Sequence, residues 1–74
     1  MLEPGEVLHA GISVRGERNL RSDRTILDAA AQHLDTWQDN QSRNLPDGKS
    51  FRVYERITRY DGYATVTRYL TVEG

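Results

Sequence analysis

The dipeptide Asp61-Gly62 constrains this chain more than any other feature, because it lies between two segments whose side chains alternate. Residues 50–60 (SFRVYERITRY) and 63–73 (YATVTRYLTVE) both have the period of two that is typical of β-strands. A two-residue Asp-Gly loop between such segments is a strong signal for a hairpin with a type I′ turn, which needs a positive φ at both loop residues. We therefore predict a C-terminal β-hairpin that turns at Asp61-Gly62.

This turn also sets the register of the hairpin, since Tyr60 then faces Tyr63 and every other pair follows. On one face Glu55 lies opposite Arg68, and the apolar side chains lie opposite one another: Phe51 with Val72, Val53 with Leu70, and Ile57 with Val66. Cross-strand pairs of these kinds contribute about 0.2–1 kcal/mol each. The Glu55/Arg68 pair is read as a salt bridge near the edge of a covering helix, or else as part of a second oligomer or ligand surface.

Residues 7–15 (VLHAGISVR) form a third alternating segment, with one apolar face made of Leu8, Ala10, Ile12 and Val14. Gly11 within it weakens the strand, or marks a bulge or a close backbone approach.

Residues 22–42 have the amphipathic pattern of a helix that begins near Ser22 to Thr25 and ends near Ser42. Thr25 with Asp28 resembles a capping box, and Ser22 or Asp23 could cap instead. Leu45-Pro46-Asp47-Gly48 ends the helix, because proline disfavours helical geometry at the preceding residue.

The predicted fold is a single small α+β domain spanning residues 1–74, with element order β-α-β-β. A right-handed crossover places the helix on one face of a three-stranded sheet of strand order 1-3-2. The inner face would hold the apolar residues of the three strands, Val53 among them, covered by Ile26, Ala30, Leu34 and Trp37.

Composition narrows the chemistry available to so small a domain. A chain of 74 residues buries only a modest core, and without cysteine it cannot add disulfides or thiolate metal sites. A partner subunit is therefore the most available source of additional stability. The net charge of −1 gives no global field toward nucleic acid. No apolar run approaches the roughly 18 residues of a membrane span, and the first residues lack the pattern of a signal peptide, so a cytoplasmic location is expected.

The outer face of the sheet is the main candidate site. It carries aromatic and basic side chains with threonines between them: Arg52, Tyr54, Arg56, Tyr60, Tyr63 and Tyr69. Three interpretations remain open: these residues reflect β propensity alone, they form a protein interface that includes self-association, or they bind single-stranded nucleic acid by stacking and phosphate contacts.

Two charged segments are secondary candidates. Arg15, Arg18 and Arg21 precede the helix, where an anion site is conceivable, although a solvated loop explains them as well. The helix stripe Asp28, Gln32, Asp35 and Asp39 is read as a solvated face, or as a surface for a basic partner.

Catalytic residues are not recognisable. His9 and His33 are far apart in sequence, and no nucleophile–base spacing, metal motif or nucleotide loop is present. We therefore expect a non-enzymatic protein without a cofactor: a self-associating protein-interaction module such as a regulator, an inhibitor or an accessory protein of the phage type. A small nucleic-acid-binding domain that uses Arg52, Tyr54, Arg56 and Tyr69 is the alternative.

Overall fold

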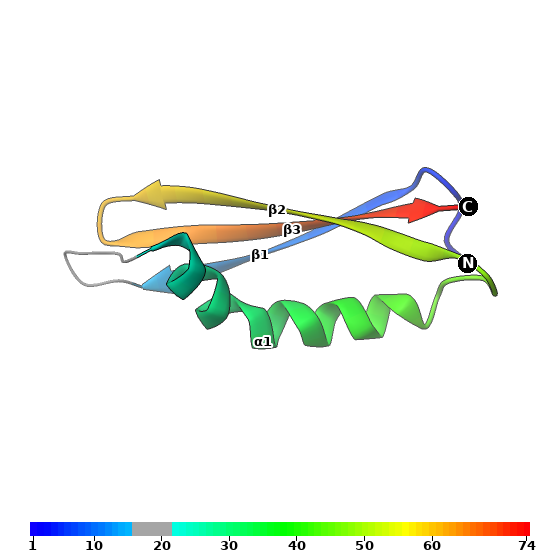
Figure 1. Ribbon diagram of the computed structural model, residues 1–74, viewed down its shortest axis with the longest axis horizontal. Helices are drawn as coiled ribbons and strands as arrows, with labels where there is room; N and C mark the ends of the chain where they lie inside the picture. Colours follow the sequence, from blue (N-terminus) through cyan, green and yellow to red (C-terminus); the bar gives the residue numbers. More distant parts are fainter. Residues whose placement is uncertain (16–21) are drawn as a thin grey trace.

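Three strands and one helix make up the part of the chain that the computed structural model describes, residues 1–15 and 22–74. They follow in the order β1 (Val7–Arg15), α1 (Asp23–Ser42), β2 (Ser50–Tyr60) and β3 (Tyr63–Glu73). The sheet has the order β1-β3-β2, and both edge strands run antiparallel to the central β3. Helix α1 lies along one face of this sheet (Figure 1). The predicted β-α-β-β domain, its strand order and its C-terminal hairpin are thus confirmed.

The hairpin has the register that the loop length predicts, but its turn is of another type. Tyr60 pairs with Tyr63, and the pairing runs unbroken to Ser50 opposite Glu73. Gly62 has a φ of 83°, whereas no residue other than glycine has a positive φ in the described part of the chain. Asp61 therefore cannot have the positive φ of a type I′ turn, so that prediction was wrong; the sign pattern is that of a type II turn.

Strand β1 pairs with β3 over its whole length, from Val7 opposite Thr71 to Arg15 opposite Tyr63. This continuous register leaves no place for a bulge at Gly11. A Cβ atom added there would find its nearest neighbour, Oγ1 of Thr67, at 3.5 Å, which is an ordinary contact. The predicted bulge or close backbone approach at Gly11 is therefore wrong.

Helix α1 begins after Ser22, whose Oγ accepts a hydrogen bond from the Thr25 backbone N–H at 3.4 Å. Ser22 is thus the N-cap, and Thr25 is its partner rather than the cap. At the other end the Asn44 N–H bonds the Gln41 carbonyl at 3.0 Å, which closes the last turn before Pro46.

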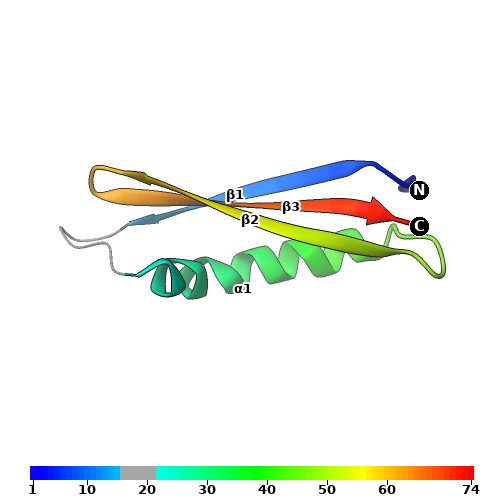
Figure 2. The same cartoon turned by 45° about the horizontal axis from the view of Figure 1, so that its top comes forward.

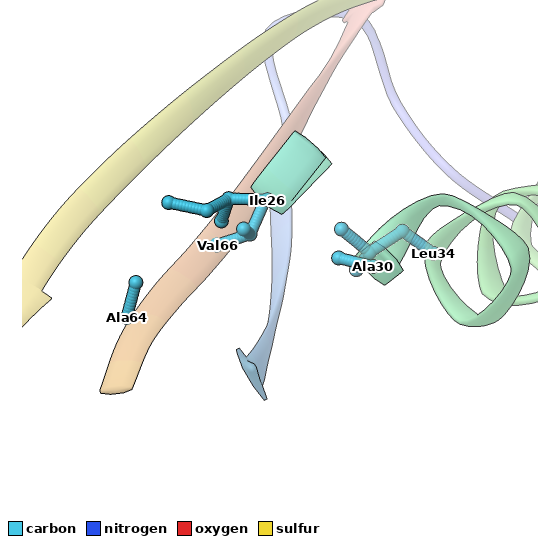
Figure 3. Close-up of a cluster of buried hydrophobic side chains, with 5 residues drawn as sticks. All are labelled: Ile26, Ala30, Leu34, Ala64 and Val66. Carbon is cyan, nitrogen blue, oxygen red and sulfur yellow. The ribbon is translucent and has the colours of Figure 1, made fainter. Parts of the chain in front are cut away.

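The core lies between α1 and the central strand. Ile26, Ala30 and Leu34 of the helix face Ala64 and Val66 of β3 (Figure 3). The row of buried apolar side chains continues along β3 through Leu70 and Val72. Burying side chains of this size contributes about 1.5–3 kcal/mol each.

Helix α1 packs mainly over β1 and β3 and touches β2 least. Val53 in β2 consequently keeps 46 % of its surface exposed, although it lies on the same face of the sheet as the core. The prediction that the helix covers Val53 was therefore wrong, because one helix is too narrow to cover all three strands.

The molecule is elongated, with Cα extents of 45 × 18 × 15 Å. The strands are long, and in two views the helix stays on one side of the sheet (Figure 2). Within the described ranges, no segment covers the opposite face, which we call the outer face. No helix in the described chain has the length and apolar character required to cross a membrane.

Candidate functional site

The outer face is built by the period of two in the three strands, so the strand registers decide which side chains become neighbours. All six predicted residues of this site belong to it, and the register with β1 adds His9 and Arg15. Its aromatic and charged members are His9, Arg15, Arg52, Tyr54, Arg56, Tyr60, Tyr63, Tyr69 and Glu73.

A row of three rings crosses the whole sheet on this face. His9 pairs with Tyr69, and Tyr69 pairs with Tyr54. The ring centroids are 6.0 Å apart for His9–Tyr69 and 5.8 Å apart for Tyr69–Tyr54, with tilted planes in both pairs. Tyr54 is 63 % exposed. The row therefore offers an apolar surface, one ring wide, to a ligand.

A second ring pair lies at the turn of the hairpin. Tyr60 and Tyr63 stack with centroids 4.8 Å apart and an interplanar angle of 14°. Arg15 is the partner of Tyr63 on β1, so a guanidinium group lies in the same cross-strand row as these two rings. Tyr60 and Tyr63 are 50 % and 40 % exposed, so the stack is accessible.

Charge on the outer face is unbalanced in favour of arginine. Its only carboxylate in the described strands is Glu73, which bonds Arg52 at 3.2 Å. Among the described residues no carboxylate lies within salt-bridge distance of Arg56 or Arg15. The helix on the other side of the sheet carries four aspartates against a single arginine. The small net charge thus conceals a basic outer face and an acidic helix face.

Arg68 holds the inner face of the hairpin to the helix. It is 7 % exposed, and its guanidinium donates to Glu55 Oε2 at 3.0 and 3.1 Å, to Asp35 Oδ1 at 2.7 Å and to Gln38 Oε1 at 2.9 Å. The predicted Glu55/Arg68 salt bridge is present. Asp35, which was assigned to a solvated stripe, instead takes part in this cluster.

The Arg68 pKa is set by two opposing effects. Burial lowers it, but the hydrogen bonds and charges of Asp35 and Glu55 outweigh burial and raise the pKa above its ordinary value. Arg68 therefore stays charged near neutral pH, and its cluster acts as a structural link. No buried side-chain N or O atom of the described residues lacks a hydrogen-bond partner.

Arg59 and Asp23 form a second link between hairpin and helix, with 2.6 Å from Nη2 to Oδ1. Sequence reasoning missed this link and the role of Gln38. The only sign of these contacts in the sequence was that Asp35 and Gln38 are three residues apart and so lie on one side of a helix. The helical pattern does not reveal which strand that side of the helix faces.

The proposed anion site is described only in part. Arg15 is exposed at the end of β1, on the outer face, while Arg18 and Arg21 lie outside the described residues. His9 and His33 do not meet, since His9 is on the outer face and His33 is exposed on the helix at the opposite side of the sheet. Across residues 1–15 and 22–74, no three His, Asp or Glu side chains gather as a metal site would require.

Comparison with models of protein families, with curated proteins and with solved structures yields no match to this chain.

Proposed function

We propose that this protein is a non-enzymatic protein-interaction module that binds an acidic protein surface with the outer face of its sheet. The observation that carries the proposal is the ring row His9–Tyr69–Tyr54 beside arginines that outnumber the carboxylates of that face. Tyrosine and arginine are among the side chains that contribute most at protein interfaces, because each combines a large contact area with directed polar groups. A small regulator, inhibitor or accessory protein would use such a face.

The test is affinity capture from nuclease-treated extract of the source cells, with bound proteins quantified by mass spectrometry. We expect the double substitution Tyr54→Ser with Tyr69→Ser to lose a protein that the unmodified chain retains. Gln32→Ala, on the exposed side of α1, is the matched control and should retain it. Equal capture by all three chains would contradict the proposal.

A second candidate function, binding of single-stranded nucleic acid, is favoured by one observation: three rings lie in a row beside Arg56, whose guanidinium has no carboxylate partner among the described residues. Bases stack on such rings with about 1–3 kcal/mol each, while arginines meet phosphates.

This candidate is tested by fluorescence anisotropy with a labelled oligo(dT) strand over a range of salt concentrations. If nucleic acid is the ligand, binding weakens with salt, and Arg56→Ala lowers the slope of log K against log salt by about 0.7. Arg24→Ala, on the helix, should leave the slope unchanged. No binding at low salt would exclude this function and leave the protein interface.

A further inference from the structure

Among the described strands, β2 forms an edge of the sheet that no other strand covers, and it is long and regular. It has eleven residues without proline, and its register with β3 contains no bulge. Because Tyr60 and Tyr63 close a two-residue loop, the N–H and C=O groups of Tyr60 and of each second residue before it point to β3. Those of Val53, Glu55, Ile57 and Arg59 therefore point to the open edge. Such an edge is a template for another strand.

We propose that a second copy of this chain pairs antiparallel along β2, with Ile57 of each copy facing Ile57 of the other on the two-fold axis. This narrows the self-association that the sequence leads us to expect to one strand and one register, and as the assembly of the interaction module it rests on the proposed function. The product is a six-stranded sheet with both helices on the same side, since the axis runs perpendicular to the sheet.

Charge on the inner face selects this register. Glu55 of each copy lies opposite Arg59 of the second copy, so two opposite-charge pairs form across the axis. Within one chain, the ion pairs between described residues join Asp35, Arg68 and Glu55 in one group and Arg59 and Asp23 in another. Pairing joins the first group of one copy to the second group of the other. The result is a row in which every charge has neighbours of opposite sign.

Aromatic residues on the outer face match in the same register. Tyr54 of each copy lies opposite Tyr60 of the second copy. The row His9–Tyr69–Tyr54 then continues into the Tyr60–Tyr63 stack of the other chain. Two such rows are related by the axis, each with rings on five of the six strands and Arg15 on the sixth, and they enlarge the proposed binding face.

Registers close to this one oppose like charges. The pairing centred on Arg56 places that arginine against itself, and the pairing centred on Glu55 does the same for glutamate. A pairing centred on Val53 opposes no like charges, but it brings no opposite charges together either. The other edge, β1, is shorter, contains Gly11 and carries Arg15 as its only acidic or basic side chain apart from His9, so nothing in it selects a register.

The edge also has the exposed apolar surface that pairing would cover. Val53 is 46 % exposed and Ile57 is half-buried, because α1 packs mainly over the other two strands. In the proposed register the partner strand shields the flank of Ile57, whereas Val53 lies opposite Asp61 in the turn of the second copy.

A single introduced cysteine tests the register, because the natural chain contains none. Directly opposed hydrogen-bonded residues of antiparallel strands have Cα atoms about 5.5 Å apart, within the range of a disulfide. Under mild oxidation we expect Ile57→Cys to form a disulfide-linked dimer at least tenfold faster than Val53→Cys, measured by intact mass. In the proposed register two copies of residue 53 lie roughly 26 Å apart, at about 3.3 Å for each residue of offset.

Faster linkage of Val53→Cys, or equally slow linkage of both variants, would overturn the proposal. Sedimentation equilibrium of the unmodified chain, which does not depend on the folding of a variant, should give a dimer mass; a monomer up to millimolar concentration would overturn it as well. Tyr69→Ser in the Ile57→Cys background separates the two ideas, since Tyr69 is on the central strand. Lost partner capture with retained linkage supports the dimer, whereas retained capture without linkage overturns the dimer and leaves the binding face intact.

Discussion

Arg68 is the residue on which the packing of this small protein most depends. It occupies a position on β3 where its neighbours along the inner face, Val66 and Leu70, are fully buried apolar side chains. A buried charge is costly unless it is paired and hydrogen-bonded. Here Glu55, Asp35 and Gln38 supply four hydrogen bonds from two different elements. The same contacts therefore satisfy the guanidinium and set where α1 lies on the sheet.

Replacing Arg68 with alanine should lower the free energy of unfolding by about 2–3 kcal/mol, since the guanidinium contacts are lost and Glu55 keeps a partly buried charge. The expected loss is at the low end for a buried pair because Asp35 is largely exposed and solvent screens its charge. Arg24→Ala is the control: the ion pair of Arg24 with Asp28 is long and exposed, so its removal should lower the free energy of unfolding by no more than about 0.5 kcal/mol. Urea denaturation measures both, and equal losses would contradict the role of Arg68.

The hairpin β2–β3 shows how much of an element short-range chemistry decides. Alternation specifies two strands, and a loop of two residues brings Tyr60 opposite Tyr63 whichever type of turn closes it. This explains why the predicted register is confirmed although the predicted turn type is wrong. Loop length sets the register, whereas the φ of Asp61 sets only the local twist of the chain.

Two glycine substitutions test this element. Gly62→Ala should destabilise the protein by about 1 kcal/mol, because Gly62 has a φ of 83° that alanine adopts only with strain. Gly11→Ala should not lower the free energy of unfolding, since a Cβ at that position meets only ordinary contacts and alanine reduces the entropy of the unfolded chain. Thermal unfolding followed by circular dichroism compares the two variants. A larger loss of stability for Gly11→Ala than for Gly62→Ala would show that the backbone at Gly11 requires glycine.

At the scale of the whole molecule, the two sides of the sheet differ in charge, although Asp23 and Asp35 on the helix side are paired with Arg59 and Arg68. The arginines of the outer face lie on one side, and the aspartates of α1 lie on the other. The net charge of −1 does not describe such a molecule, because a partner at short range meets one face only. The basic outer face of this elongated, nearly neutral domain therefore favours an orientation in which an acidic partner lies against that face.

This polarity predicts unequal effects of equal charge changes. Arg56→Glu and Arg24→Glu alter the net charge by the same amount, on the outer face and on the helix respectively. We expect Arg56→Glu to elute from a heparin column at clearly lower salt than the unmodified protein, and Arg24→Glu to elute close to it, because polyanions meet the basic face. Equal shifts for the two variants would show that net charge alone governs binding.

The strand order was predicted from the general handedness of crossover connections and not from local pattern. The local pattern of the sequence by itself determined the four elements, their bounds and the register of the hairpin, together with the assignment of six aromatic and basic residues to one face. These features depend on neighbours a few residues apart: periods of two and 3.6, a capping serine, and a two-residue loop. Only the tertiary structure decided that Arg68 bonds Asp35 and Gln38, that His9 joins the ring row, and that Val53 stays exposed. The place of His9 depends on how β1 pairs with β3, and the surroundings of Arg68 and Val53 depend on where one narrow helix lies on a wider sheet. The physical reason is that both arrangements are settled by packing between segments far apart in the chain.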